Sequence, residues 1–407
     1  MGVALKFNAP SFTPKTMFRL LVLVFWSQHT ILRYVEEVIE RLPFVSKFAP
    51  YFIPVLIISL FALSAPYIFR QVRIPDVLFG LSVVLVVVMT LLLYTYSSEY
   101  IQPELWRIFG LSVPLYYVGI VYDHEETKKD LFWISLIGVI VMFVYQIYFL
   151  GTGRELHTDN MNASYNTLPS IMYLIYWAVT NKGMKNWGIA LAVSSLSFVF
   201  GTRGPILAII IFLAIGMVYN VLKIKNAAVK IAIILAIFIS VAYIASGDTL
   251  VNLATYLSKK FGEIGFSTRI FDFFIEEQLA ESEGRERLSE AVILAIKQKP
   301  LFGYGFMGDR FITEGHYVHN IVLEFLCSYG VVFGGIASVL VALFPLEAIK
   351  RSGGTQTSWL MVMFACMIFT KLFVSGSYVY EPYFYLLMGL SVGTLRKHKK
   401  ELQAGLL

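Results

Sequence analysis

The sequence predicts an all-α polytopic membrane protein with about twelve transmembrane helices and one long extracytoplasmic loop that contains short amphipathic helices. Composition supports this class: 57% of the 407 residues are hydrophobic, the mean hydropathy is +0.69, and only 15% are charged. About a quarter of the residues in a soluble domain are charged, so most of this chain is expected to contact lipid or other apolar helices. The second observation is the regular alternation of apolar runs with short polar turns.

Twelve apolar runs are predicted to span the membrane within a single domain that covers residues 1–407. Several runs are shorter than the roughly 20 residues that a bilayer requires, but boundaries assigned from one sequence shift by a few residues. The runs lie at 18–32, 51–69, 77–96, 105–122, 131–150, 168–180, 187–200, 206–222, 231–245, 319–343, 359–374 and 383–395.

Basic residues in the turns predict the orientation of these spans. Lys and Arg are dense in every second turn, as at Arg70 and Arg73 or at Lys350 and Arg351, and sparser in most of the turns between them. Because short cytoplasmic loops are enriched in Lys and Arg, this alternation places both termini in the cytoplasm. The net charge of +6 is therefore attributed to the Lys and Arg residues that set the orientation of the spans, and no nucleic-acid partner is expected.

One long hydrophilic segment, 246–318, lies between the ninth and tenth predicted spans, and the predicted orientation places it outside the cytoplasm. Within it, 284–298 carries Leu288, Val292 and Ala295 at helical spacing and is predicted to form an amphipathic helix. Long loops often carry binding and catalytic residues, so functional residues are expected in this segment.

The sequence predicts no metal and no cofactor. Cys327 and Cys366 both lie within apolar runs, so no disulfide framework is indicated. His316 and His319 are close in sequence, but no further cluster of His, Cys or Asp completes a ligand set around them.

Two arginines are candidates for binding phosphate. Arg203 lies in the tight turn 201–205 between two apolar runs, and Arg285 lies at the start of the predicted loop helix. An arginine fork binds phosphate oxygens bidentately, and a helix N-terminus beside Arg285 would favour an anion further. The alternatives are a helix-breaking hairpin whose Arg203 extends to the lipid headgroups, and a solvated helical face that holds Arg285 in salt bridges.

The segment 315–320 joins the long loop to the tenth predicted span and carries the third candidate group. His319 is interpreted as a proton-handling residue because imidazole titrates near neutrality, although it could instead cap the helix by hydrogen bonding. Asn320 and Glu324 are four residues apart and share one helical face. A carboxylate within a span is expected to face the protein interior and to have a partner, for which Lys371 is one candidate unless it extends to the headgroups.

Taken in order, these motifs resemble the O-antigen polymerase and O-antigen ligase superfamily, which acts in the assembly of bacterial envelope glycans. The resemblance covers the back half of the chain, while the first half shares only the general hydropathy of the family. It rests on Thr202-Arg203-Gly204, Gly284-Arg285, Pro300-Leu301-Phe302-Gly303-Tyr304-Gly305, His319-Asn320, Glu324, Gly330 and Gly334.

The resemblance implies a metal-independent glycosyltransferase that acts at the outer face of the bacterial inner membrane. Its donor would be an undecaprenyl-pyrophosphate-linked glycan, and its acceptor would be a second glycan. Arg203 and Arg285 would clamp the donor pyrophosphate and stabilise the leaving group. His319 would be the general base that takes the acceptor proton, or would orient the acceptor hydroxyl, with Asn320 and Glu324 shaping the site.

Two reactions remain open within this superfamily. A polymerase joins lipid-linked repeat units, whereas a ligase transfers the glycan to lipid A-core. A polymerase is favoured, because the long loop with its basic residues and the aromatic residues Tyr378, Tyr380 and Tyr383 suit extended glycan as both donor and acceptor; a chain-length regulator is then a candidate partner. A lipid-linked-sugar flippase or another transporter is the alternative of a different class, since twelve spans with both ends inside is also a common transporter layout.

Overall fold

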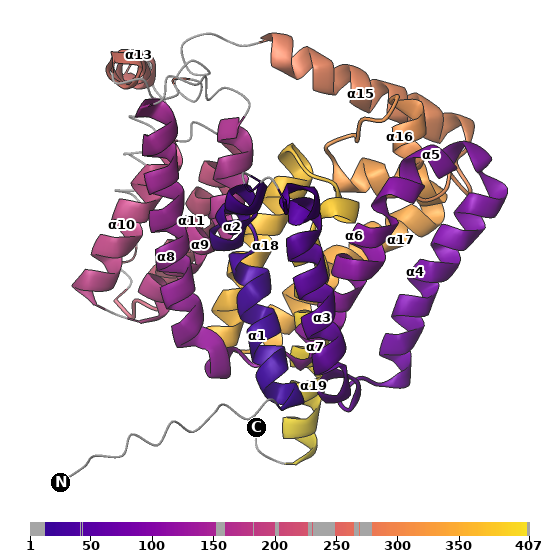
Figure 1. Ribbon diagram of the computed structural model, residues 1–407, viewed down its shortest axis with the longest axis horizontal. Helices are drawn as coiled ribbons and strands as arrows, with labels where there is room; N and C mark the ends of the chain where they lie inside the picture. The colour runs from indigo at the N-terminus through magenta and orange to yellow at the C-terminus, as the bar shows by residue number, and fades with distance from the viewer. Residues whose placement is uncertain are drawn as a thin grey trace.

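The computed structural model describes residues 13–40, 42, 44–151, 159–181, 183–199, 203–226, 230, 249–263, 268 and 279–404. Across these ranges the chain forms helices joined by turns, and no strand is present in them (Figure 1). The predicted all-α class is therefore confirmed for the described part of the chain.

The helices follow one another in the order of the predicted apolar runs. In the first half they are α1 (Pro14–Ser27), α2 (Ile31–Glu40), η1 (Ser46–Phe48), α3 (Ala49–Phe69), α4 (Ile74–Leu93), η2 (Thr95–Ser97), α5 (Ser98–Ile101), η3 (Gln102–Glu104), α6 (Leu105–Arg107), η4 (Ile108–Ser112), α7 (Val113–Val121), α8 (His124–Gly151), α9 (Asp159–Thr180), α10 (Met184–Val199) and α11 (Arg203–Leu222). In the second half they are α13 (Thr249–Glu263), α15 (Leu279–Gln298), α16 (Gly308–Ile312), α17 (Ile321–Arg351), α18 (Gln356–Val374), η5 (Tyr378–Tyr380) and α19 (Pro382–Gln403).

Five of the described helices, α3, α4, α11, α17 and α18, are long and apolar enough to cross a membrane. Each coincides with a predicted run, so the chain is a multi-pass membrane protein. The predicted run 231–245 lies outside the described residues. The count of twelve spans therefore stays a prediction.

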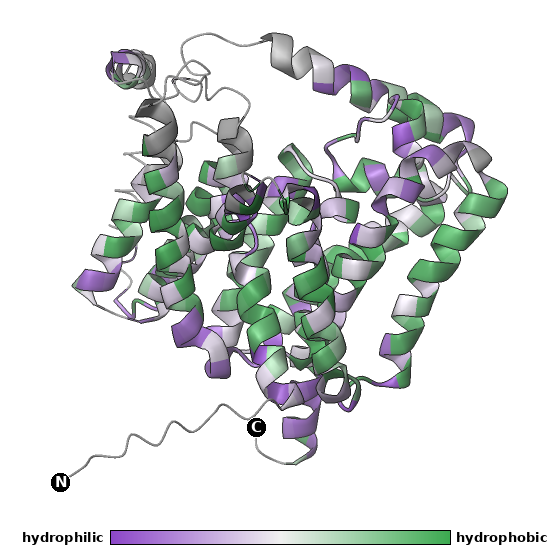
Figure 2. Cartoon of the chain, in the orientation of Figure 1, coloured by the Kyte–Doolittle hydropathy of each residue, from purple (hydrophilic) through white to green (hydrophobic). Residues whose placement is uncertain are grey.

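The helix ends define two faces of the molecule. In Figure 1, α1 begins and α19 ends on one side, here called the terminal face, whereas α13, α15 and α16 lie across the opposite side, here called the loop face. Figure 2 shows apolar residues along the middle of the helices and hydrophilic residues gathered toward both faces. This arrangement is typical of a bundle whose central band contacts lipid.

The first predicted run, 18–32, is not one continuous helix. α1 ends at Ser27 and α2 begins at Ile31, and the three polar residues between them, 28–30, form a turn. The N–H of Gln28 donates to the carbonyl of Phe25 at 3.4 Å, which closes the last turn of α1. The break matters for the site because it turns polar side chains into the interior of the bundle.

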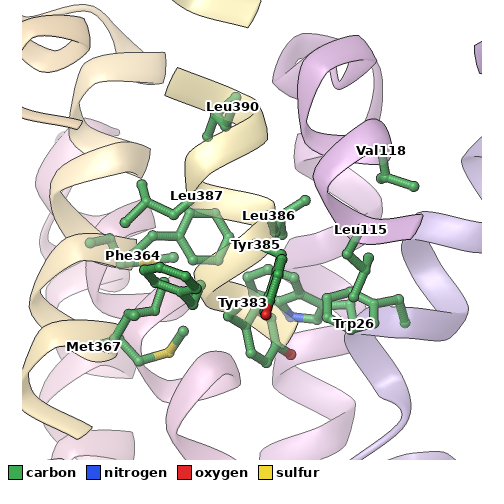
Figure 3. Packing of buried hydrophobic residues seen from close by; sticks show 14 of the residues in the cluster. Trp26, Leu115, Val118, Phe364, Met367, Tyr383, Tyr385, Leu386, Leu387 and Leu390 are labelled. Atoms are coloured by element: carbon green, nitrogen blue, oxygen red, sulfur yellow. The ribbon is translucent and has the colours of Figure 1, made fainter. Parts of the chain in front are cut away.

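Aromatic and aliphatic side chains from α1, α7, α18 and α19 form the centre of the core (Figure 3). The ring of Trp26 lies 5.9 Å from that of Phe364 and 6.0 Å from that of Tyr383, both nearly perpendicular to it. The indole N–H of Trp26 donates to Ser135 Oγ at 2.9 Å, so this buried polar group is satisfied.

α17 is interrupted at Gly330, where a φ of 76° and a ψ of 175° define a backbone conformation that is essentially restricted to glycine. The loop segment 300–305 packs directly on this break, and a Cβ at Gly330 would overlap the carbonyl of Leu301. Backbone hydrogen bonds run in both directions between the segment and α17, so the loop satisfies groups that the helix leaves open. They join Tyr304 N to Cys327 O (2.8 Å), Gly305 N to Ser328 O (2.9 Å) and Val331 N to Pro300 O (2.7 Å).

α7 and α19 approach each other at backbone contact through two glycines. A Cβ at Gly119 would overlap the Leu386 carbonyl, and a Cβ at Gly389 would overlap the Tyr116 carbonyl. Small residues permit this close helix packing within membranes, where association depends on van der Waals contact. The pair fixes α19, and with it the polar turn that precedes α19, against the first half of the chain.

We expect Gly389→Ala to destabilise the bundle because the added methyl group has to displace backbone atoms, at a cost of about 1–3 kcal/mol. Gly335→Ala on α17 is the matched control, since nothing lies within 4 Å of a Cβ at that position. The measurement is the midpoint of thermal unfolding in detergent. Equal midpoints for the two variants would contradict the backbone contact between α7 and α19.

Candidate active site

A buried arginine, Arg310 of α16, organises the loop face. Its side chain is 1% exposed, and Nη1 donates to Asp309 Oδ1 and to Glu324 Oε1 of α17, each at 2.5 Å. Nη2 donates to Ser377 Oγ, and the Ser377 hydroxyl in turn donates to Glu324 Oε1 at 2.5 Å. One guanidinium thus joins α16, the start of α17 and the segment before η5.

The surroundings of Arg310 stabilise its positive charge. Burial opposes the charged form, but the two carboxylates raise the pKa of Arg310 well above its usual value, so the guanidinium stays protonated. Its carbon Cζ lies 5.3 Å from the ring centre of Tyr380 and 5.6 Å from that of Tyr317. These cation–π contacts orient both rings, and the Tyr317 hydroxyl also donates to the Ser375 carbonyl at 2.9 Å.

His319 lies beside this network, immediately before α17. Its φ of 54° is in the left-handed region, and its ring centre is 4.4 Å from that of Tyr317. Burial lowers the pKa of His319 to about 4, with a further contribution from the charge of Arg285. The imidazole is therefore neutral at pH 7, and its buried Nδ1 has no hydrogen-bond partner among the described residues. A neutral ring with an open nitrogen is suited to accept a proton.

Arg285 is brought to His319 by the docking of α15 on the loop face. Val292 and Ala295 of α15 are buried against Tyr304 and Val318. This docking places Arg285 where its charge acts on His319, Tyr317 and Tyr165 of α9.

The predicted contribution of a helix N-terminus beside Arg285 is wrong. α15 begins at Leu279, so Arg285 lies beyond its first turn, where the N–H groups already bond within the helix. The residues 279–283 are mostly good helix formers, and they extend the helix backward from the predicted start at Gly284.

Arg203 is the first residue of α11, and its side chain lies outside the described part of the structure. Its neighbour Gly204 packs on Tyr165, because a Cβ at Gly204 would overlap the Tyr165 hydroxyl. The Ser375 hydroxyl donates a hydrogen bond to the same oxygen. The start of α11, the helix α9 and the segment before η5 therefore meet at Tyr165, which the charge of Arg285 also reaches.

Asn320 and Glu324 both have structural partners. Asn320 Oδ1 accepts from Val322 N at 3.0 Å and from Leu323 N at 3.2 Å, so Asn320 caps α17 and the alternative of a His319 cap is wrong. Glu324 is 1% exposed and faces the interior, as predicted, but its partner is Arg310.

Lys371 is not the partner of Glu324. It pairs with Glu381 at 2.5 Å and lies 5.5 Å from the ring centre of Tyr165. The physical reason is that Lys371 is near the end of α18, next to the turn that carries Glu381, whereas Glu324 is enclosed by α16 and Ser377.

A cavity of about 720 Å³ adjoins this cluster within the helix bundle. Tyr380, which lies beside Arg310, lines the cavity, and so do Tyr165 and Lys371, which contact each other. The rest of its wall comes largely from the first half of the chain, which carried no motif, and the predicted site residues that the structure describes are not among the residues that line it.

Sequence reasoning missed the residues that hold the site together, namely Asp309, Arg310, Tyr317, Ser377 and Tyr165. The adjacent Asp309 and Arg310 were a usable signal, because a charged pair within a short segment of mostly apolar residues is expected to be buried with partners. Ser377 and Tyr165 carried no signal of their own.

Within the described ranges, no group of three or more His, Cys, Asp or Glu side chains could hold a metal ion. Cys327 and Cys366 are both free and buried.

We expect Glu324→Gln to lower the free energy of unfolding by about 3–5 kcal/mol, because it leaves part of the buried Arg310 charge uncompensated. Glu347→Gln on the same helix is the matched control. Glu347 and Arg351 are both more than a third exposed, so the loss of this pair should cost less than about 0.5 kcal/mol. Thermal unfolding in detergent measures both, and an equal effect would exclude a central role for the Arg310 network.

The segment of the chain that contains most of this site is similar to a known protein family. Residues 188–340 match a family model described as O-antigen ligase, and this segment contains Arg203, Arg285, Arg310, His319 and Glu324. No curated protein and no solved structure matches the chain. The matched segment also contains every motif on which the sequence resemblance rests, so the match of residues 188–340 supports the O-antigen polymerase and ligase superfamily for this part of the chain.

Proposed function

We propose that the protein is a polymerase that joins undecaprenyl-pyrophosphate-linked oligosaccharide repeat units at the outer face of the bacterial inner membrane. The product would be an O-antigen, a capsule or an exopolysaccharide. The match of residues 188–340 to the O-antigen ligase family model supports a membrane glycosyltransferase of this type. The specific donor, the metal independence and the choice of polymerisation are our proposals.

One observation carries this proposal. Three segments far apart in sequence support it: the charge of Arg285 acts on Tyr165 and Tyr317, the start of α11 packs on Tyr165 at Gly204, and the His319 ring packs on Tyr317. Phosphate-binding cations next to a neutral imidazole are the groups that glycosyl transfer from a lipid pyrophosphate requires.

Arg203 and Arg285 bind the donor pyrophosphate in this proposal. Their forks hold oxygens of the phosphate that leaves when the bond between the anomeric carbon and that phosphate breaks. Because the charge of the leaving group increases in the transition state, two guanidinium groups stabilise the transition state more than the bound donor.

His319 acts on the acceptor. Its neutral ring takes the proton of the acceptor hydroxyl while the acceptor oxygen bonds to the anomeric carbon, and the lipid pyrophosphate leaves with the electron pair of the broken bond. Asn320 and Glu324 shape this site indirectly, since Asn320 caps α17 and Glu324 holds Arg310. Arg310 orients Tyr317, and Tyr317 supports the His319 ring.

Polymerisation is favoured over ligation because aromatic side chains line the cavity beside the site. Of the three tyrosines noted in the sequence, Tyr380 and Tyr383 line the cavity, whereas Tyr378 packs on Phe325 and exchanges a hydrogen bond with Tyr329. Aromatic walls suit an extended glycan, and a chain-length regulator is then a proposed partner.

The proposed topology has twelve spans and both termini in the cytoplasm. It is supported by the position of the start of α1 and the end of α19 on one face, opposite α15 and α16 (Figure 1). Basic residues gather on that terminal face, among them Lys350 and Arg351 at the end of α17.

We expect Arg285→Lys, Arg203→Lys and His319→Ala to lose most activity. A lysine keeps the charge but not the fork, and removal of a general base costs about a hundredfold or more. His316→Ala is the matched control, because His316 is exposed three residues before His319. The measurement is glycan laddering by purified protein from lipid-linked donor alone, in buffer with a chelator, with donor-lipid binding measured in parallel.

Each outcome of this assay bears on a separate part of the proposal. Normal laddering by His319→Ala would remove His319 from the mechanism, and normal activity of both lysine variants would leave the pyrophosphate clamp without support. Transfer that requires lipid A-core as acceptor would replace polymerase with ligase. Activity that returns only when a divalent cation is added would contradict metal independence.

Reporter fusions are expected to place residue 246 and residue 400 on opposite sides of the membrane, outside and inside respectively. The reason is the preference of short basic turns for the cytoplasm, which orients the terminal face inward. An alkaline phosphatase fusion should be active at the first position and a green fluorescent protein fusion at the second. Two fusions on the same side would refute the twelve-span topology.

A further inference from the structure

We propose that the cavity beside the site binds the sugar residues next to the reacting bond, through the unpartnered polar groups of Gln28 and Tyr383 and the aromatic wall around them. This inference rests on the proposed glycosyl transfer and specifies which part of the substrate the cavity holds. It assigns a binding role to the first half of the chain, which has no motif for it.

The break between α1 and α2 is what opens this cavity. Its wall is formed by the turn that contains Gln28 together with side chains of α2, α3, α6, η4, α8, α9, α18, η5 and the start of α19. Its volume of about 720 Å³ is within the range of pockets that enclose small ligands. The cavity is therefore large enough for a short stretch of glycan, but not for a lipid-linked polymer.

Two buried polar groups in the wall lack a partner within the described structure. Gln28 is 4% exposed and its Nε2 makes no hydrogen bond, and Tyr383 is 3% exposed and its hydroxyl makes none. A buried donor without an acceptor is unfavourable, and buried polar groups are normally satisfied. Hydroxyl groups of a sugar can both accept from Gln28 and exchange hydrogen bonds with Tyr383.

The rest of the wall favours an uncharged, hydroxyl-rich ligand over a second pyrophosphate. The cations that line it are already paired: Arg33 with Glu36 at 2.8 Å, Arg107 with Glu104 at 3.2 Å and Lys371 with Glu381 at 2.5 Å. Neutralised cations attract an anion weakly, but their N–H groups can still donate hydrogen bonds to a ligand. Trp106, Tyr145 and Tyr380 add aromatic faces, on which the apolar face of a sugar ring can pack.

Two tyrosines of the cavity wall lie next to the residues proposed to react. Tyr380 lines the cavity, and its ring centre is 6.0 Å from that of Tyr317, which packs on His319. Tyr165 lines another part of the wall and is reached by the charge of Arg285. A sugar in the cavity would therefore lie next to the groups proposed to hold the pyrophosphate and to take the proton.

The binding experiment uses purified full-length protein and two probes. The first probe is the free repeat-unit oligosaccharide, released by mild acid from the lipid-linked substrate of the host strain, and the second is undecaprenyl pyrophosphate without sugar. Gln28→Met and Tyr383→Phe each remove one polar group at nearly constant volume. Tyr173→Phe is the matched control, because Tyr173 is a buried tyrosine of α9 that does not line the cavity and whose hydroxyl donates to the Lys128 carbonyl.

We expect Gln28→Met and Tyr383→Phe each to weaken oligosaccharide binding about 3- to 10-fold, the effect of losing one buried hydrogen bond. Binding of undecaprenyl pyrophosphate should not change in either variant, and Tyr173→Phe should bind both probes as the wild type does. Calorimetry measures the affinities. Trp106 provides a second signal, since oligosaccharide binding should alter its fluorescence and Trp106→Phe should remove that change.

The two probes separate failure of this inference from failure of the proposed function. If undecaprenyl pyrophosphate binds in an Arg285-dependent manner but the oligosaccharide does not bind, or binds equally to all variants, the cavity assignment is wrong and the transferase proposal stands. If binding of undecaprenyl pyrophosphate does not depend on Arg285, the proposed pyrophosphate clamp is wrong. A loss of oligosaccharide binding in Gln28→Met would still support a sugar site in the cavity.

Kinetics distinguish whether the bound sugar belongs to the acceptor or to the donor. With free oligosaccharide as acceptor, an acceptor site predicts that Tyr383→Phe raises the KM for that acceptor about 3- to 10-fold and leaves the KM for donor lipid unchanged. A donor site predicts the reverse. Unchanged KM values for both substrates in both cavity variants, with thermal unfolding like that of the wild type, would overturn the proposal.

Discussion

The buried guanidinium of Arg310 is the interaction on which the loop face depends. It neutralises Asp309 and Glu324 where water does not reach them, and it holds Ser377 and the rings of Tyr317 and Tyr380 in place. A charge buried with this many partners is sensitive to the loss of any one of them, because the remaining charges cannot be solvated. The geometry around His319 follows from this network, since Tyr317 lies between Arg310 and the imidazole.

Much of the fold could be predicted because hydrophobic runs and helical periodicity are local properties of the sequence. The apolar runs coincide with α3, α4, α11, α17 and α18, and the spacing of Val292 and Ala295 identified the buried face of α15. The inward direction of Glu324 also followed from a local argument, the cost of a carboxylate in lipid. The partner of Glu324 could not be predicted in this way, because Arg310 and Lys371 both carry the required positive charge. Only the packing of α16 decides between them. The break at Gln28 was missed for a similar reason: an apolar run with three polar residues resembles a span until the cavity beside it is known.

The proposed reacting groups and the cavity come from different parts of the chain. Arg203, Arg285 and His319 lie within residues 188–340, the segment that matches the family model. The cavity wall is built from residues before and after that segment, from Gln28 to Pro169 and from Met367 to Tyr383. Under the proposed function, the transfer chemistry and the selection of the glycan can therefore change separately, since substitutions in the wall need not disturb the groups proposed to bind pyrophosphate.

The interrupted helix α17 also constrains how the protein is made. The segment 300–305 leaves the ribosome before α17, yet its backbone hydrogen-bonds to carbonyls of Cys327 and Ser328 that are synthesised later. These groups are without their partners until α17 has been made, and the segment can dock only when α17 has broken at Gly330. Completion of the loop face is thus a late step of biogenesis, and a nascent chain stalled before α17 would carry Arg285 and Arg310 without the surface that brings them together.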